Sequence, residues 1–349
     1  MINFLRSLFP SAAHDKAQAK APNRQPDPPA ELYAPGVESF AFRSYLQYVN
    51  KFPVPDWKAV SEWLGSLTDP GEQAKLWTSC EMAWLQHLRV ALGPEYYLDE
   101  AGDSILLSPL DRSISQATLG FMNKTQARIS RILHDIALIP KWKKNILIVF
   151  DDDDAYYRYV SRYYLDDGEF ARSSGMHINT GCSHFVTIRA DLWAIEPVIA
   201  HEMTHGVLGH LPIPVWLNEG IAVNTEQRLC PPPRPLFTAR EMHEKHLEFW
   251  GTKEIQEFWS GKSFLRTDDG NTLSYDLARI LVSQFSSDWE SFRGFVLAAD
   301  ARDAGATAAH EHLGVDLGAS VAAIFKREDT AGWTPDLDAW HEAPKRVAS

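Results

Sequence analysis

The segment from His201 to Ala222, HEMTHGVLGHLPIPVWLNEGIA, holds the residues of this 349-residue chain whose types and spacing best suit chemistry. On a helix, His201 and His205 are separated by about 40° of rotation, so both imidazoles project from one face and can reach the same ion. Glu202 then lies beside that ion, where its carboxylate can take a proton from a water molecule. This HExxH pattern predicts one Zn²⁺ per chain, with the two histidines as metal ligands and Glu202 as the catalytic general base.

A surface helix could carry the same residues by chance. The flanking residues VIA and VLG are apolar, however, and predict a buried helix. Burying two histidines and a glutamate without partners would be costly, so zinc binding accounts for their presence better than chance does.

A third histidine follows the motif but has the wrong spacing for a ligand. A catalytic zinc ion usually has three protein ligands and one open position. The metzincin pattern would place Gly at position 208 and His at 211, whereas this chain has Leu208 and Leu211. On a continuing helix His210 would lie about 140° from His205 and point away from the ion. We therefore interpret His210 as a residue at the end of the helix, where the macrodipole favours it.

Glu219 is the better candidate for the third ligand. Pro212 and Pro214 end the first helix, and the segment from Trp216 to Ala222 predicts a second helix that can return one side chain to the ion. His-Glu-x-x-His followed by Trp-Leu-Asn-Glu-Gly-x-Ala resembles the gluzincin metallopeptidases, most closely the branch called peptidase MA-like. In that family the glutamate before glycine is the third zinc ligand, which corresponds to Glu219 here. The alternative is that Glu219 is an ordinary exposed helix residue.

The resemblance implies a zinc-dependent peptidase with a peptide or protein substrate. Related gluzincins stabilise the oxyanion with a tyrosine beyond the glutamate ligand, and Tyr275 in LSYDLARILVSQF matches it, although a core tyrosine is the alternative. Gluzincin aminopeptidases carry a Gly-x-Met-Glu-Asn strand whose glutamate binds the substrate amino group, but GMHIN has Ile178 at that position. This difference favours an endopeptidase, although the strand could still pair with an extended peptide. His177 is either a substrate contact or a surface residue.

The expected fold is α+β with a thermolysin-like gluzincin core, in which a mixed sheet lobe, an active-site helix and a helical C-terminal lobe position these residues. We expect a flexible tail at residues 1–38, an extra N-terminal helical region at 39–95 and a metallopeptidase domain at 96–345, whose sheet lobe ends near residue 211. The tail is rich in Ala, Pro and charge and lacks an apolar period. The resemblance to gluzincins covers roughly residues 96–335.

Apolar spacing predicts the individual elements. Spacings of three and four residues indicate amphipathic helices, and short apolar runs indicate strands. Helices are expected over 57–67, 74–92 and 115–137, strands over 103–110, 144–150 and twice within 175–190, and mainly helices after residue 222. The run KNILIVF at 144–150 is typical of a strand that is buried on both sides. Pro197 is expected to start the helix that carries the histidines.

A run of aspartates from Asp151 to Asp154 follows this strand. It suits either a Mg²⁺ or Ca²⁺ site or the first turn of a helix. A nucleotide site would also need a phosphate loop, but Gly261-Lys262-Ser263 lacks the earlier glycine, because position 256 is Gln256. Helix capping is therefore the simpler interpretation.

Composition narrows the classes of function. Lys and Arg number 34 and Asp and Glu 46, so the net charge of −12 offers no basic field to a nucleic acid. The three cysteines are widely spaced and indicate neither a disulfide framework nor a thiolate zinc site. No segment approaches the ~20 apolar residues of a membrane span, and the apolar run in MINFLRSLFP is short for a secretory signal. We expect no membrane span and a cytoplasmic location.

Two other functions fit the same residues. The first is a binding or scaffold protein with a structural or vestigial zinc site, although the presence of every expected ligand and of the base argues against decay. The second is a zinc hydrolase that acts on a non-peptide amide.

Overall fold

The computed structural model describes residues 25–140, 142–163, 175–232 and 237–340. Its centre is a five-stranded sheet with the order β3-β4-β5-β7-β6. The strands are β3 (Tyr97–Ala101), β4 (Ser104–Ser108), β5 (Asn145–Phe150), β6 (Gly175–Ile178) and β7 (His184–Ile188). β4, β5 and β7 are parallel, whereas β3 and β6 each run antiparallel to their neighbour. The expected α+β fold with a mixed sheet is confirmed, but β3 was not predicted from the sequence.

The central strand β5 contributes to two hydrophobic cores. Ile148 and Phe150 belong to a core that the sheet shares with the N-terminal helices, and Leu147 and Val149 belong to a core that it shares with α4, α6 and the C-terminal helices. Successive side chains of a strand point to opposite faces, so a strand between two cores needs an unbroken apolar run. The prediction that this strand is buried on both sides is confirmed.

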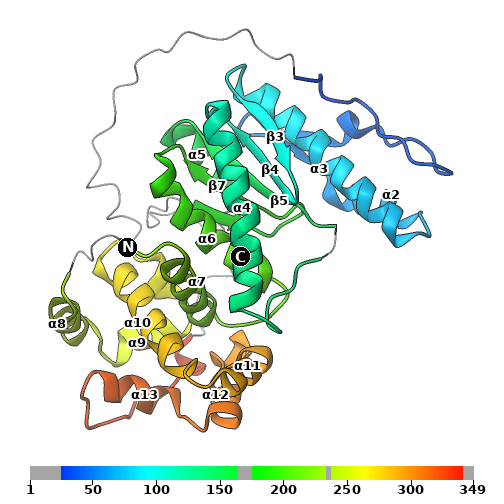
Figure 1. Ribbon diagram of the computed structural model, residues 1–349. Coiled ribbons are helices and arrows are strands. Elements are labelled where there is room, and N and C mark those ends of the chain that lie inside the picture. The colour runs from blue at the N-terminus through cyan, green and yellow to red at the C-terminus, as the bar shows by residue number, and fades with distance from the viewer. Residues whose placement is uncertain (1–24, 141, 164–174, 233–236, 341–349) are drawn as a thin grey trace.

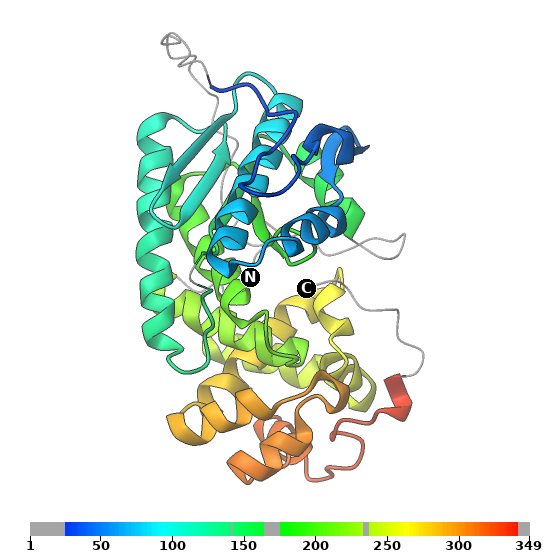
Figure 2. The same ribbon diagram turned by 90° about the vertical axis from the view of Figure 1, so that its right-hand side faces the viewer.

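The N-terminal region covers one face of the sheet, on the side opposite α4 (Figure 2). It contains β1 (Leu46–Val49), β2 (Phe52–Pro55), α2 (Trp57–Gly65) and α3 (Pro70–Leu92). Trp84 and Leu85 of α3 are buried in the same core as Ile148. His87 and Arg89 of α3 also bond to the carbonyls of Pro29 and Pro26, which lie in the segment for which a flexible tail was predicted.

The other face of the sheet is covered by α4 (Arg112–Ile132) and α6 (Leu192–Leu208). The prediction that Pro197 starts α6 is wrong, because the helix begins at Leu192 and Pro197 lies inside it. Proline has the φ angle of a helix, but at this sixth helical position it lacks the N–H that would bond to the carbonyl of Trp193 and its ring crowds that carbonyl. The helix α5 (Asp153–Val160) follows β5, and the Asp152 carboxylate accepts a bond from the Ala155 N–H, which supports the capping interpretation.

The chain beyond α6 is largely helical, as expected, and lies below the sheet in Figure 1. Its helices are α7 (Val215–Leu229), α8 (Ala239–Phe249), α9 (Thr252–Trp259), α10 (Asp269–Phe285), α11 (Trp289–Ala298), α12 (Ala306–Leu313) and α13 (Leu317–Ile324). Short 3₁₀ turns are η1 (Phe42–Tyr45), η2 (Ser161–Tyr163), η3 (Lys262–Leu265), η4 (Ala301–Asp303) and η5 (Asp338–Trp340). None of the helices described combines the length and the hydropathy needed to span a membrane.

A close approach of α7 to α10 depends on Gly220. A Cβ atom at this position would lie 2.6 Å from the carbonyl oxygen of Ala278, so only glycine allows this spacing. Asn224 joins the same two helices, because its Nδ2 donates to the carbonyl of Arg279 at 2.9 Å. This packing fixes α10 beside the part of α7 that carries Glu219.

Candidate metal centre

The three predicted metal ligands meet where α6 packs against α7. The ligand atoms of His201, His205 and Glu219 all lie within 4.8 Å of one another. Glu219 Oε2 is 3.2 Å from His201 Nε2 and 3.5 Å from His205 Nε2. His201 is buried, and the other two side chains are largely buried, with exposed fractions of 12% for His205 and 18% for Glu219. Two imidazole nitrogens and a carboxylate oxygen therefore converge in a site that is largely shielded from solvent.

The second nitrogen of each imidazole is held by a side chain from α7. His201 Nδ1 is 3.0 Å from Glu226 Oε2, and His205 Nδ1 is 3.0 Å from Asn218 Oδ1. Both partners accept a hydrogen bond here, so Nδ1 carries a proton and Nε2 is the nitrogen that faces the shared site, where a metal ion could displace its proton. Such support is usual behind metal-binding histidines. The residues thus fit a divalent metal in donor type, geometry and orientation.

Asn218 and Glu226 were not predicted from the sequence. Glu226 lies seven residues after Glu219, which is about two helical turns, so both carboxylates share one face of α7. That spacing could have predicted that Glu226 lies on the same side of α7 as Glu219. Asn218 directly precedes the ligand, but nothing in the sequence shows that its amide reaches His205.

Electrostatic coupling within the cluster favours a bound cation. Burial disfavours a charged His201, but hydrogen bonds with Glu219 and Glu226 outweigh burial and hold its pKa well above the ordinary value. Burial also opposes ionisation of Glu219, yet the charge of His205 and the bonds with both histidines keep its pKa well below its usual range. A metal ion would replace the proton that these carboxylates hold on the imidazoles.

The predicted base, Glu202, lies beside the edge strand β6 rather than within the ligand cluster. It is buried, and its carboxylate accepts a hydrogen bond from the backbone N–H of His177. Gly175 lets α6 pack close to β6, because a Cβ atom there would clash with Val198 Cγ1 and lie 3.1 Å from Glu202 Oε1. Burial raises the pKa of Glu202, and the charges of His201 and His205 offset this only in part. A raised pKa makes a carboxylate a stronger base.

The structure also places the remaining residues named from the sequence. Tyr275 of α10 lies near the ligands, with its ring centroid 6.3 Å from that of His201. His210 is exposed beyond the end of α6 and is not part of the cluster. His177 Nε2 is 3.1 Å from Ser183 Oγ. Ile178, which stands at the position compared above with a glutamate of aminopeptidases, is buried in the core on the N-terminal side of the sheet.

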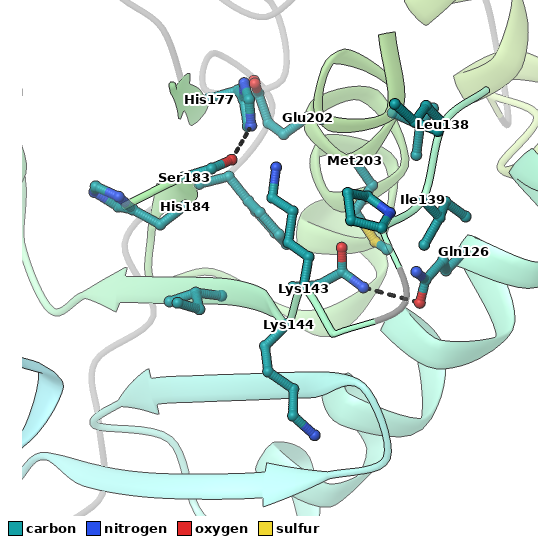
Figure 3. Close-up of a pocket in the computed structure, with 16 residues that line it drawn as sticks. Gln126, Leu138, Ile139, Lys143, Lys144, His177, Ser183, His184, Glu202 and Met203 are labelled. Atoms are coloured by element: carbon teal, nitrogen blue, oxygen red, sulfur yellow. Dashed lines mark hydrogen bonds between the residues drawn. The ribbon is translucent and has the colours of Figure 1, made fainter. Parts of the chain in front are cut away.

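A pocket adjoins Glu202 on the side of the sheet (Figure 3). Met203 and Gly206 of α6 line it, together with His177 of β6 and Lys143 from the segment before β5. The candidate metal centre therefore has a neighbouring recess, and the buried carboxyl of Glu202 faces both.

In comparison with known proteins, no family model and no curated protein matches this chain. The geometry alone shows a largely buried cluster of His201, His205 and Glu219 that is compatible with an HExxH...E zinc site and could hold one metal ion.

Proposed function

We propose that the protein is a zinc-dependent metallopeptidase that hydrolyses internal peptide bonds. The observation that carries this proposal is the convergence of His201 Nε2, His205 Nε2 and Glu219 Oε2 beside the buried carboxyl of Glu202. A purely structural zinc site usually has four protein ligands, whereas a catalytic site has three and keeps one position open. Three ligands with a buried carboxylate alongside match the catalytic kind.

His201, His205 and Glu219 would hold the zinc ion, and Glu226 and Asn218 would keep the imidazoles oriented toward it. When bound, zinc polarises the scissile carbonyl and makes water more acidic. All other steps fall to side chains and backbone groups of the protein.

Glu202 moves the proton in this mechanism. It takes a proton from the attacking water and then delivers that proton to the nitrogen of the leaving amine. Its hydrogen bond with the N–H of His177 holds the carboxylate beside β6. This position keeps the base next to the strand along which we expect the substrate to lie.

The edge strand β6 is the proposed binding site for the substrate backbone. Within the described residues β6 pairs only with β7, so its other edge can accept an extended peptide. The apolar Ile178 offers no anion to a substrate amino terminus, which favours cleavage within a chain. The phenol of Tyr275 would stabilise the oxyanion by donating a hydrogen bond.

Glu202→Gln tests the proposal. It should retain zinc and lose about 10²–10⁴-fold in turnover, because the amide cannot act as a base. Zinc content is measured by elemental analysis, and cleavage is measured by mass spectrometry of a broad peptide-library digest. His210→Ala is the matched control on the same segment and should keep both zinc and activity.

Unchanged turnover of Glu202→Gln would refute the proposed mechanism. If the native protein bound zinc but cleaved no peptide, a scaffold or a hydrolase of non-peptide amides would be favoured instead. If it bound no zinc, the metallopeptidase proposal would fail at its first step.

A further inference from the structure

The pocket beside Glu202 contains a lysine that the proposed mechanism does not use. The pocket lies between α6 and the amino ends of β5 and β7, and Glu202, His177 and Lys143 line it together. In Figure 3 the side chain of Lys143 extends toward Ser183, His177 and Glu202. A group that enters this pocket would therefore meet both the ammonium of Lys143 and the proposed base.

The neighbouring lysine has a different role. Lys144 points away from the pocket interior in Figure 3, toward the hairpin of β3 and β4. Its Nζ is 3.1 Å from Glu100 Oε1 and donates to the carbonyl of Gly102 at 2.6 Å. Lys144 is thus a paired structural cation, and it provides a control one residue from Lys143.

Lys143 has no comparable partner. Over the ranges that the structure describes, its ammonium makes no hydrogen bond and no ion pair within 4.0 Å. Burial lowers its pKa, and Cys182 and Glu81 counteract this only in part. A half-buried cation without a partner is unfavourable, so an entering anion would stabilise it.

Glu81, whose negative charge counteracts the lowering of the Lys143 pKa, does not fill this role. Its Oε1 accepts a bond from Trp77 Nε1 at 2.8 Å and a weak one from Cys182 Sγ. Its Oε2 is buried and has no hydrogen-bond partner in the described part of the chain. Burial raises the pKa of Glu81 to about 7, so the group is partly neutral near neutral pH.

The other titratable groups that line the pocket are His177, His184 and Lys144, so Glu202 is its one acidic side chain among the described residues. We infer that Lys143 binds a carboxylate of the substrate next to the scissile bond, which makes peptides with an acidic group at that position the preferred substrates. This inference rests on the proposed peptidase function. The carboxylate can belong to an Asp or Glu side chain or to a free C-terminus.

Matched peptide pairs test the preference. Each pair differs only by Asp against Asn, or Glu against Gln, at one position near the scissile bond, and each peptide is made with a free and with an amidated C-terminus. A hydrogen-bonded ion pair in this pocket should raise kcat/KM for the acidic member by about 10- to 100-fold. A preference that survives amidation assigns the carboxylate to a side chain, and one that amidation abolishes assigns it to the C-terminus.

Variants of Lys143 assign the preference to this residue. Lys143→Gln should make kcat/KM equal for the acidic and neutral peptides of a pair. Lys143→Glu should reverse the preference in favour of peptides with Lys at that position, and Lys143→Arg should retain the ratio of kcat/KM between acidic and neutral peptides. Lys144→Gln should also retain it. If Lys143 served only as a counter-charge for Glu81, Lys143→Gln would change stability and leave the ratio intact, which would overturn the inference.

A binding measurement separates this inference from the proposed function. The same peptides are titrated into zinc-loaded Glu202→Gln protein, and affinity is followed by calorimetry. If no peptide is cleaved by the native protein, the peptidase proposal fails, but tighter binding of acidic peptides that depends on Lys143 still supports the carboxylate site. Equal affinity for acidic and neutral peptides would overturn it even if the protein is an active peptidase.

Discussion

Replacing Glu226 with glutamine should weaken zinc binding although Glu226 is not a ligand. The Glu226 carboxylate lies 3.0 Å from His201 Nδ1, and its side chain is only 19% exposed. Glutamine has nearly the same shape and can still accept the hydrogen bond, but it lacks the negative charge. The substitution therefore isolates the electrostatic part of the support for His201.

The size of the effect follows from this geometry. A carboxylate behind an imidazole makes Nε2 a better donor to a metal, and loss of such support typically lowers metal affinity by about 10- to 100-fold. That range corresponds to roughly 1.4–2.7 kcal/mol. Because the pair is largely sheltered from solvent, we expect salt to screen it weakly.

Competition between the protein and a chromophoric chelator measures the zinc affinity. Glu244→Gln is the matched control, because Glu244 is an exposed helix residue paired with Arg240 on α8. Circular dichroism of both variants checks that the helices are intact. If Glu226→Gln bound zinc as tightly as the native protein and the control, the carboxylate would have no role in orienting or activating His201.

Three further predictions test other parts of the structure. Tyr275→Phe should retain zinc but lower kcat by roughly 10²–10³-fold if the phenol stabilises the oxyanion, whereas unchanged kcat would make Tyr275 a packing residue. Gly220→Ala should lower the free energy of unfolding by about 1–3 kcal/mol, measured in urea, because the new methyl would meet the Ala278 carbonyl; native stability would disprove the close contact. In zinc-stripped protein, the raised pKa of His201 and the lowered pKa of Glu219 mean that their attraction stabilises the fold. This stabilisation is fully present between their ordinary pKa values of 4.5 and 6.5. It is lost as pH rises through the folded pKa of His201 and as pH falls through the folded pKa of Glu219. Zinc binding should accordingly release protons, which calorimetry in buffers of different ionisation enthalpy can count, and binding without proton release would contradict the coupling.

The sequence was sufficient where the chemistry depended on local spacing. His201 and His205 are one helical turn apart, so helical geometry alone places them on one face, and the prolines after α6 indicated that Glu219 lies on a second helix. Glu226 and Asn218 were out of reach because their partners depend on how α6 crosses α7. That crossing is set by tertiary packing, including the contact at Gly220.

The fold shows the same division between local and tertiary information. KNILIVF predicted a strand between two cores because a short, unbroken apolar run can bury all of its side chains only when both faces of the strand are covered. β3 was missed because it is an edge strand with the polar residues Asp99 and Glu100. The start of α6 was misplaced because proline at N1 and proline in the second turn give similar sequence patterns. The burial of α3 against the sheet could not be predicted from its own apolar stripe, which has no preferred partner.

The shared oxygen of Glu219 also bears on how the protein would respond to loss of its metal. Small zinc domains unfold without their ion because they lack a core that could hold the ligands in place. Here, α6 and α7 both contribute to one large hydrophobic core, and Glu219 Oε2 already lies near both imidazoles. The cage is preorganised, so little conformational entropy is lost when an ion enters. A chelator should therefore leave a folded but inactive protein, and added zinc should restore it without refolding, which makes metal supply a reversible control over the proposed activity.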